Sequence, residues 1–121
     1  MQTKQEKIAQ LINIATLEAG GLRELGRRIH TSPAALIAMR KGERPANYRT
    51  RGKLRVMAGE NPAQAFITSI IEDLKASDDA TEKEAAASLI AIVALINATE
   101  AKIEKAPTLG HASGVMRATK A

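Results

Sequence analysis

Residues 22–45 have the sequence LRELGRRIHTSPAALIAMRKGERP, which predicts two short helices joined by a tight turn. Apolar residues recur along it at three- and four-residue steps, the spacing of one helix face: Leu25, Ile29, Leu36 and Met39. Ser32 is a typical helix N-cap, and Pro33 follows at the first helical position, where its missing amide costs nothing. We therefore expect the second helix to begin at Pro33 and to end before Gly42.

Helical periodicity continues on both sides of this pair. Apolar residues at helical spacing predict a helix over about residues 3–18. On the other side, residues 43–49 contain a proline and an asparagine and predict a loop, after which a weaker helix covers about residues 50–58. The first half of the chain is therefore expected to be helical throughout.

Two capping signals predict the helices of the second half. Asn61 and Gln64 have the spacing of a capping box, with a proline at the first helical position. Thr81 and Glu84 form a similar pair, which is expected to open a long helix that reaches Lys105. Residues 106–121 lack periodicity and are expected to be a disordered tail.

Charge divides the chain into two parts. Residues 21–59 contain ten basic and two acidic residues, a net charge of +8, whereas residues 60–106 contain four basic and nine acidic residues, a net charge of −5. A basic segment of this kind is typical of proteins that bind nucleic acid.

Composition excludes several other classes of protein. The chain has no cysteine, so it has no disulfide or thiolate metal site. Its first residues lack the pattern of a signal peptide. The longest uncharged stretch, residues 85–99, is shorter than the roughly 20 residues that span a bilayer, so we expect no membrane helix and a cytoplasmic protein.

The central stretch resembles the helix-turn-helix of the Cro and phage-repressor family over about residues 5–60. The apolar positions named above match the family pattern, and Gly26 is the small residue needed where the two helices cross. Ser32, Gly42 and Pro45 also match. The resemblance implies an all-α fold in which a five-helix-type helix-turn-helix domain is followed by a long C-terminal helix. It also implies a phage- or prophage-type transcriptional regulator, such as a repressor, that binds operator sequences in double-stranded DNA.

Two departures from the family pattern concern the turn and the second helix. His30 stands where the family usually has a glycine in the left-handed conformation. The exposed face of the second helix, where the family has polar side chains, offers Pro33, Ala34, Ile37 and Ala38. These can contact thymine methyl groups but form no hydrogen bonds with bases.

The remaining polar and basic side chains of the first half supply the predicted DNA contacts. Base edges are expected to be contacted by Ser32, Arg40, Lys41, Arg44 and Asn47. Phosphates are expected to be contacted by Arg23, Arg27, Arg28, Tyr48, Arg49, Arg51 and Lys53. If six phosphates are neutralised, log K falls with log salt at a slope of about −5.

The last helix has more apolar surface than one small chain can cover. We expect residues 61–105 to be an oligomerisation segment that joins the DNA-binding domain of residues 1–60 to a second copy. The expected contacts are Leu89, Ile92, Val93, Ile96 and Ile103. A homodimer or tetramer can present two helices to half-sites about 34 Å apart.

One alternative function is a protein-interaction module, such as an antirepressor or the neutralising partner of a toxin, whose apolar third helix contacts protein in place of bases. An enzyme is not expected, because no motif supplies a nucleophile with a base or a phosphate-binding loop. We also expect no cofactor, no small-molecule substrate and no metal, since the acidic run at Asp78 and Asp79 lacks the pattern of a calcium loop.

Overall fold

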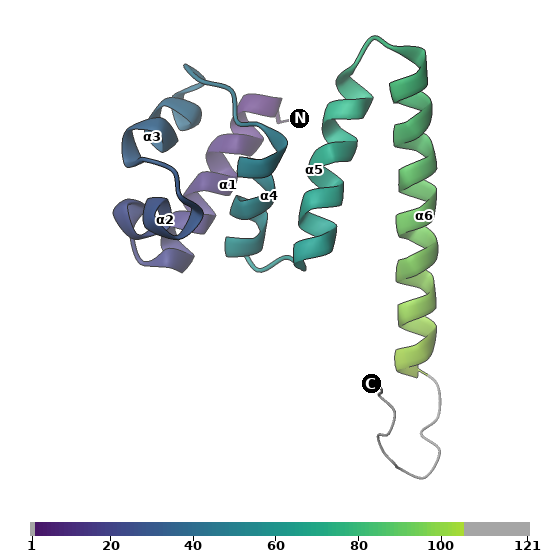
Figure 1. The fold of residues 1–121 in the computed structure, drawn as a ribbon. Helices are drawn as coiled ribbons and strands as arrows, with labels where there is room; N and C mark the ends of the chain where they lie inside the picture. Colours follow the sequence, from purple (N-terminus) through teal and green to yellow (C-terminus); the bar gives the residue numbers. More distant parts are fainter. Residues whose placement is uncertain (1, 106–121) are drawn as a thin grey trace. The chain divides into compact units, whose positions relative to one another are not determined.

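The computed structural model describes residues 2–105, with side chains up to residue 102, and in this range the chain forms six helices and no strand (Figure 1). The prediction of an all-α protein is confirmed. The helices are α1 (Lys4–Ala19), α2 (Leu22–Ile29), α3 (Pro33–Lys41), α4 (Tyr48–Met57), α5 (Pro62–Ala76) and α6 (Ala80–Lys105). The predicted tail and the side chain of Ile103 lie outside the described residues.

Polar caps explain where the helices begin. The side chains of Thr3, Ser32, Asn47 and Asn61 each accept a hydrogen bond from the backbone amide three residues later. The caps at Ser32 and Asn61 are those that the sequence predicts. Because Asn47 is also a cap, α4 begins at Tyr48, two residues before the predicted start.

The predicted start of the last helix is wrong. The carboxylate of Asp79 accepts a hydrogen bond of 3.0 Å from the amide of Glu82, and the Asp79 carbonyl accepts one from the amide of Lys83. Asp79 is therefore the cap of α6, and Thr81 lies inside the helix. An aspartate at this position also interacts favourably with the helix dipole.

The chain divides into two compact units, Met1–Ile90 and Ala91–Ala121. In the first unit, α1 packs against α2, α3 and α4, and α5 packs along α4. The core of the α1–α4 bundle includes four completely buried side chains, one from each helix: Ile12, Leu25, Leu36 and Leu54. The predicted core residues Leu25, Ile29, Leu36 and Met39 are all buried, which confirms this part of the interpretation.

A close approach of backbone to backbone fixes the angle between α2 and α3. A Cβ atom at Gly26 would lie 2.4 Å from the carbonyl oxygen of Thr31 in the turn. Only glycine fits at this position. This finding confirms the prediction that a small residue is needed where the two helices meet.

Gly52 allows a second close approach, between α4 and α5. A Cβ atom there would lie 2.7 Å from the ring of Phe66. The ring can therefore lie directly on the α4 backbone. Residues 61–76 lie in the same compact unit as residues 1–60.

Several large apolar side chains of the long α6 are exposed. Within the second unit, Ile92, Leu95 and Ile96 are 52%, 68% and 49% exposed, and they lie on one side of the helix at three- and four-residue steps. By length and composition alone, Ala80–Lys102 is apolar enough to cross a membrane, a property that core helices of soluble proteins share.

The turn between α2 and α3 contains a strained residue. His30 has φ 57° and ψ 44°. This is the left-handed conformation expected at a position where the helix-turn-helix family usually has glycine. Its backbone amide closes α2 by donating to the carbonyl of Gly26. A residue with a Cβ atom pays about 1–2 kcal/mol for this conformation.

We expect His30→Gly to raise the free energy of unfolding by about 0.5–1 kcal/mol, because the relief of strain exceeds the extra freedom of glycine in the unfolded chain. His30→Ala keeps the strain and is the matched control. Urea denaturation followed by circular dichroism measures both changes. A glycine variant that is no more stable than the alanine variant would contradict this account of the turn.

Candidate nucleic-acid interface

The outer face of α3 is open to solvent. Ala34 is exposed and Ile37 and Ala38 are half-buried, and all three share one helix face with the exposed Lys41. At the start of the helix, the Ser32 hydroxyl accepts a hydrogen bond of 3.1 Å from the amide of Ala35. Its own hydrogen is still free to be donated, because a hydroxyl can donate and accept at once.

The end of α3 is tied to α1 by two side chains. Gln5 donates hydrogen bonds to the carbonyl of Arg40 and to that of Met39, which also accepts from the backbone amide of Gly42. The guanidinium of Arg40 donates a hydrogen bond of 3.3 Å to the Asn13 side chain. These contacts fix the end of α3 on the bundle and engage one of the predicted base-contacting arginines.

Beyond this point the chain offers free cations. Lys41 and Arg44 are exposed, and neither forms an ion pair or hydrogen bond with any residue that the structure describes. Arg23 on α2 is also exposed, and it too forms no ion pair or hydrogen bond with any described residue. These three side chains can bind an anion without first breaking a contact in the protein.

The other two arginines of α2 share one carboxylate. Arg27 and Arg28 both form ion pairs with Glu24, which lies three residues before Arg27 and four before Arg28 on the same helix. Their hydrogen bonds lower the pKa of Glu24 to about 2. Since the lowered pKa belongs to the folded state, the pairs persist above about pH 4.5, the ordinary value, and are lost as the pH falls towards about 2.

The predicted contacts on and before α4 are already engaged within the protein. Asn47 accepts a hydrogen bond of 2.9 Å from the amide of Thr50 and is the cap of α4. Arg49 is exposed, donates to the Tyr48 hydroxyl at 3.2 Å, and places its guanidinium carbon 5.7 Å from the centre of that ring. Lys53 is half-buried and donates to the carbonyl of Ile29 at the end of α2.

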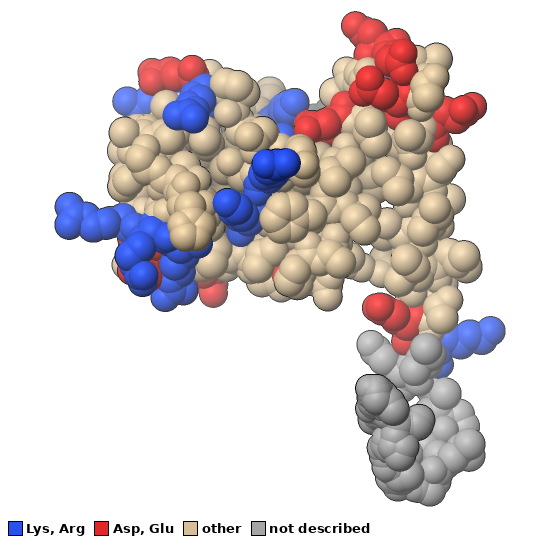
Figure 2. All heavy atoms as spheres, viewed as in Figure 1, with Lys and Arg blue, Asp and Glu red and all other residues tan. Residues whose placement is uncertain are grey.

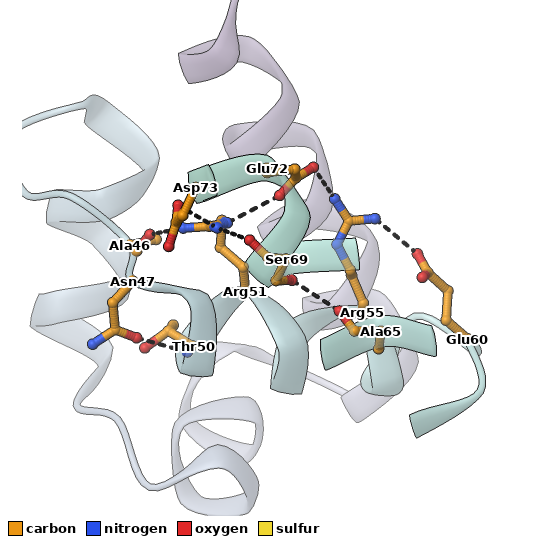
Figure 3. A network of polar contacts seen from close by, with 10 residues as sticks. All are labelled: Ala46, Asn47, Thr50, Arg51, Arg55, Glu60, Ala65, Ser69, Glu72 and Asp73. Atoms are coloured by element: carbon orange, nitrogen blue, oxygen red, sulfur yellow. Dashed lines mark hydrogen bonds and ion pairs between the residues drawn. The ribbon is translucent and has the colours of Figure 1, made fainter. Parts of the chain in front are cut away.

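Arg51 is not available to DNA, and its assignment as a phosphate contact is wrong. Arg51 is only 4% exposed. Its guanidinium donates hydrogen bonds to the backbone carbonyls of Ala46 and Ser69 at 2.6 and 2.7 Å (Figure 3). It also forms ion pairs with Glu72 at 3.2 Å and Asp73 at 2.8 Å. The charge of Arg51 therefore joins the α3–α4 loop and α4 to α5.

Arg55 extends the same network one turn along α4. Its guanidinium pairs with Glu72, which thus bridges two arginines, and with Glu60 at 3.3 Å. Its Nε atom is buried and makes no hydrogen bond to any described group. Two of the ten basic residues in residues 21–59 therefore hold α5 in place.

The exposed cations of the candidate interface come from α2, the end of α3, the following loop and α4. They are Arg23, Arg27, Arg28, Lys41, Arg44 and Arg49. In Figure 2, lysine and arginine side chains form separate groups over the α2–α4 side of the first unit. Separate groups can each contact a phosphate, because a duplex carries its charges in a row.

Sequence reasoning missed three residues that shape this surface. Gln5 and Asn13 hold the end of α3, and Glu24 pairs with two arginines. Glu24 could have been found, because glutamate three and four residues before arginine is a known helix pairing. Gln5 and Asn13 could not, since they meet α3 only in the folded chain.

Comparisons with known proteins add no relative: no family model, curated protein or solved structure matches this chain. Among the described residues, no group of three or more histidine, cysteine, aspartate or glutamate side chains is placed to hold a metal ion. The function must therefore be argued from the surface itself.

We expect Arg51→Met to lower the free energy of unfolding by about 2–4 kcal/mol. The change removes the donor to the buried carbonyl of Ala46 and a second donor to that of Ser69, and it leaves Asp73 without an ion-pair partner and Glu72 with Arg55 alone. Arg49→Met, two residues away and exposed, removes the same charge and is expected to change stability by less than about 0.5 kcal/mol. Urea denaturation distinguishes the two, and equal effects would contradict a structural role for Arg51.

Proposed function

We propose that this protein is a sequence-specific DNA-binding regulator of the phage or prophage type, in which α2 and α3 act as a helix-turn-helix. The observation that carries the proposal is the surface of α3. Its outer face is open, and exposed cations occupy the elements before and after it, with three of them free of any partner among the described residues.

Phosphate contacts supply most of the affinity in this proposal. Each lysine or arginine that neutralises a phosphate releases a counterion, so binding weakens steeply as salt rises. Arg23, Lys41 and Arg44 bind at no internal cost, whereas Arg27 and Arg28 must share their charge with Glu24. The slope of about −5 expected from the sequence is the upper limit, reached when all six exposed cations neutralise phosphates.

Base recognition depends on few groups. Ala34, Ile37 and Ala38 offer methyl groups that fit thymine in the major groove. Hydrogen bonds to bases fall to Ser32, Lys41 and Arg44, because Asn47 is a cap and Arg40 is held by Asn13. Such a face favours operators in which thymine lies near guanine, the base that lysine and arginine prefer.

A salt titration of DNA binding tests this proposal. We expect the double variant Lys41→Gln, Arg44→Gln to bind duplex DNA more weakly and to reduce the steepness of the salt dependence by about 2, because two phosphate or base contacts are lost. The control is Lys75→Gln on α5, which removes a lysine outside the proposed interface. A wild-type affinity that is independent of salt, or an equal loss in the control, would contradict DNA binding by this surface.

We further propose that the protein binds DNA as a homo-oligomer joined through α6. Ile92, Leu95 and Ile96 form a stripe at the spacing of a helix pair, and charged residues stand near both ends of the apolar run, Glu84 and Glu100. A second copy of the helix covers such a stripe and keeps these charges in water. Symmetric pairing would also place two copies of α3 on two half-sites.

The oligomer is tested by substitution on the stripe. We expect the wild-type protein to be a dimer or tetramer in light scattering after gel filtration, and Leu95→Asp to be monomeric, because a buried unpaired charge opposes association. Ala94→Asp places the same charge on another side of the helix and should leave the oligomer intact. A monomeric wild-type protein that floats with lipid vesicles would instead favour a membrane helix.

The second candidate function is a protein-interaction module, and the apolar outer face of α3 favours it. Ala34, Ile37 and Ala38 resemble the anchors of a helix that binds a groove in another protein. A stoichiometric protein partner, with no preference for any DNA sequence over random competitor, would select this alternative.

A further inference from the structure

A cavity of about 360 Å³ lies within the first unit, between α1, α4 and α5. One part of its wall is apolar and is formed by Ile8 and Leu11 of α1 and Ala76 of α5. Both α1 residues are only half-buried, so the apolar wall is open to a ligand from solvent. The volume lies within the range of pockets that hold small organic molecules.

The rest of the wall is strongly cationic. Lys4, Lys7 and Lys75 line the cavity, and none of them forms an ion pair with any carboxylate that the structure describes. Arg51 and Arg55 also line it, and their shared partner Glu72 is the only acid in the wall. Because Arg51 and Arg55 are already paired with Glu72 and with acids beside the cavity, the uncompensated positive charge of the wall comes from the three lysines.

Arg55 adds an unmet hydrogen-bond donor. Its Nε–H is buried and has no acceptor among the described groups, although its two terminal nitrogens pair with Glu60 and Glu72. A buried donor without an acceptor costs free energy. Because this atom is closed to solvent, a ligand in the cavity is held by the ammonium groups of the three lysines, and Arg55 contributes positive charge beside them.

We propose that this cavity binds a small organic anion with an apolar body, such as a medium-chain carboxylate. The acid group lies among Lys7, Lys75 and Arg55, where charge-assisted hydrogen bonds hold it. The apolar body lies on Ile8, Leu11 and Ala76. Such a ligand contacts α1, α4 and α5 together and stabilises their packing. This site is separate from the outer face of α3 and does not depend on DNA binding.

Sodium octanoate is the probe, and 1-octanol, with the same chain and no charge, is its matched control. In calorimetric titration of the full-length protein we expect saturable octanoate binding and binding of octanol at least about tenfold weaker, the effect of losing a charge-assisted hydrogen bond. Octanoate should also raise the midpoint of thermal unfolding, since it binds the folded state.

Two variants localise the binding. The double variant Lys7→Gln, Lys75→Gln should weaken octanoate binding at least about tenfold. Ala76→Phe, which adds a large side chain at the wall of the cavity and keeps every charge, should also weaken octanoate binding. Lys102→Gln on α6 is the charge control and should bind as the wild type does. Circular dichroism verifies that each variant is folded. Absence of octanoate binding, equal binding of octanol, or unchanged binding in Ala76→Phe would overturn the proposal. None of these results bears on DNA binding.

Discussion

The buried guanidinium of Arg51 is the interaction on which the arrangement of the first unit depends. Its donors form a planar fork that reaches two separate parts of the chain: the carbonyl of Ala46 in the α3–α4 loop, and the Ser69 carbonyl with the carboxylates of Glu72 and Asp73 on α5. Ala46 immediately precedes Asn47, the cap of α4. By holding Ala46, Arg51 fixes both the end of the loop that leaves α3 and the start of the helix that follows.

The cost of burying this charge is limited by where its partners lie. Glu72 and Asp73 keep 39% and 45% of their side chains exposed, so water still solvates them while they pair with Arg51. A pair buried on both sides would carry a larger desolvation penalty. The close approach of Phe66 to Gly52 adds apolar contact to the same α4–α5 interface, so charge and packing act together there.

The fold was predictable from sequence wherever local chemistry determines it. The caps at Ser32 and Asn61 and the core positions of α2 and α3 follow from side chains a few residues apart, whereas the left-handed conformation at His30 was expected from the family resemblance. The role of Arg51 did not follow, because its four acceptors lie 5 to 22 residues away along the chain and meet only after folding. Before folding, Arg51 is indistinguishable from Arg49, whose side chain remains on the surface.

The same limit explains why net charge overstates the candidate interface. Of the basic residues in the N-terminal half, Arg51 and Arg55 neutralise acids of α5 and of the loop before it, and Arg27 and Arg28 share Glu24. The charge that can act on a partner is therefore concentrated in Arg23, Lys41 and Arg44, at the start of α2 and just after α3. In the proposed complex, the cations before and after α3 supply the affinity for a polyanion. Selectivity then depends on which partner surface fits the methyl groups of Ala34, Ile37 and Ala38.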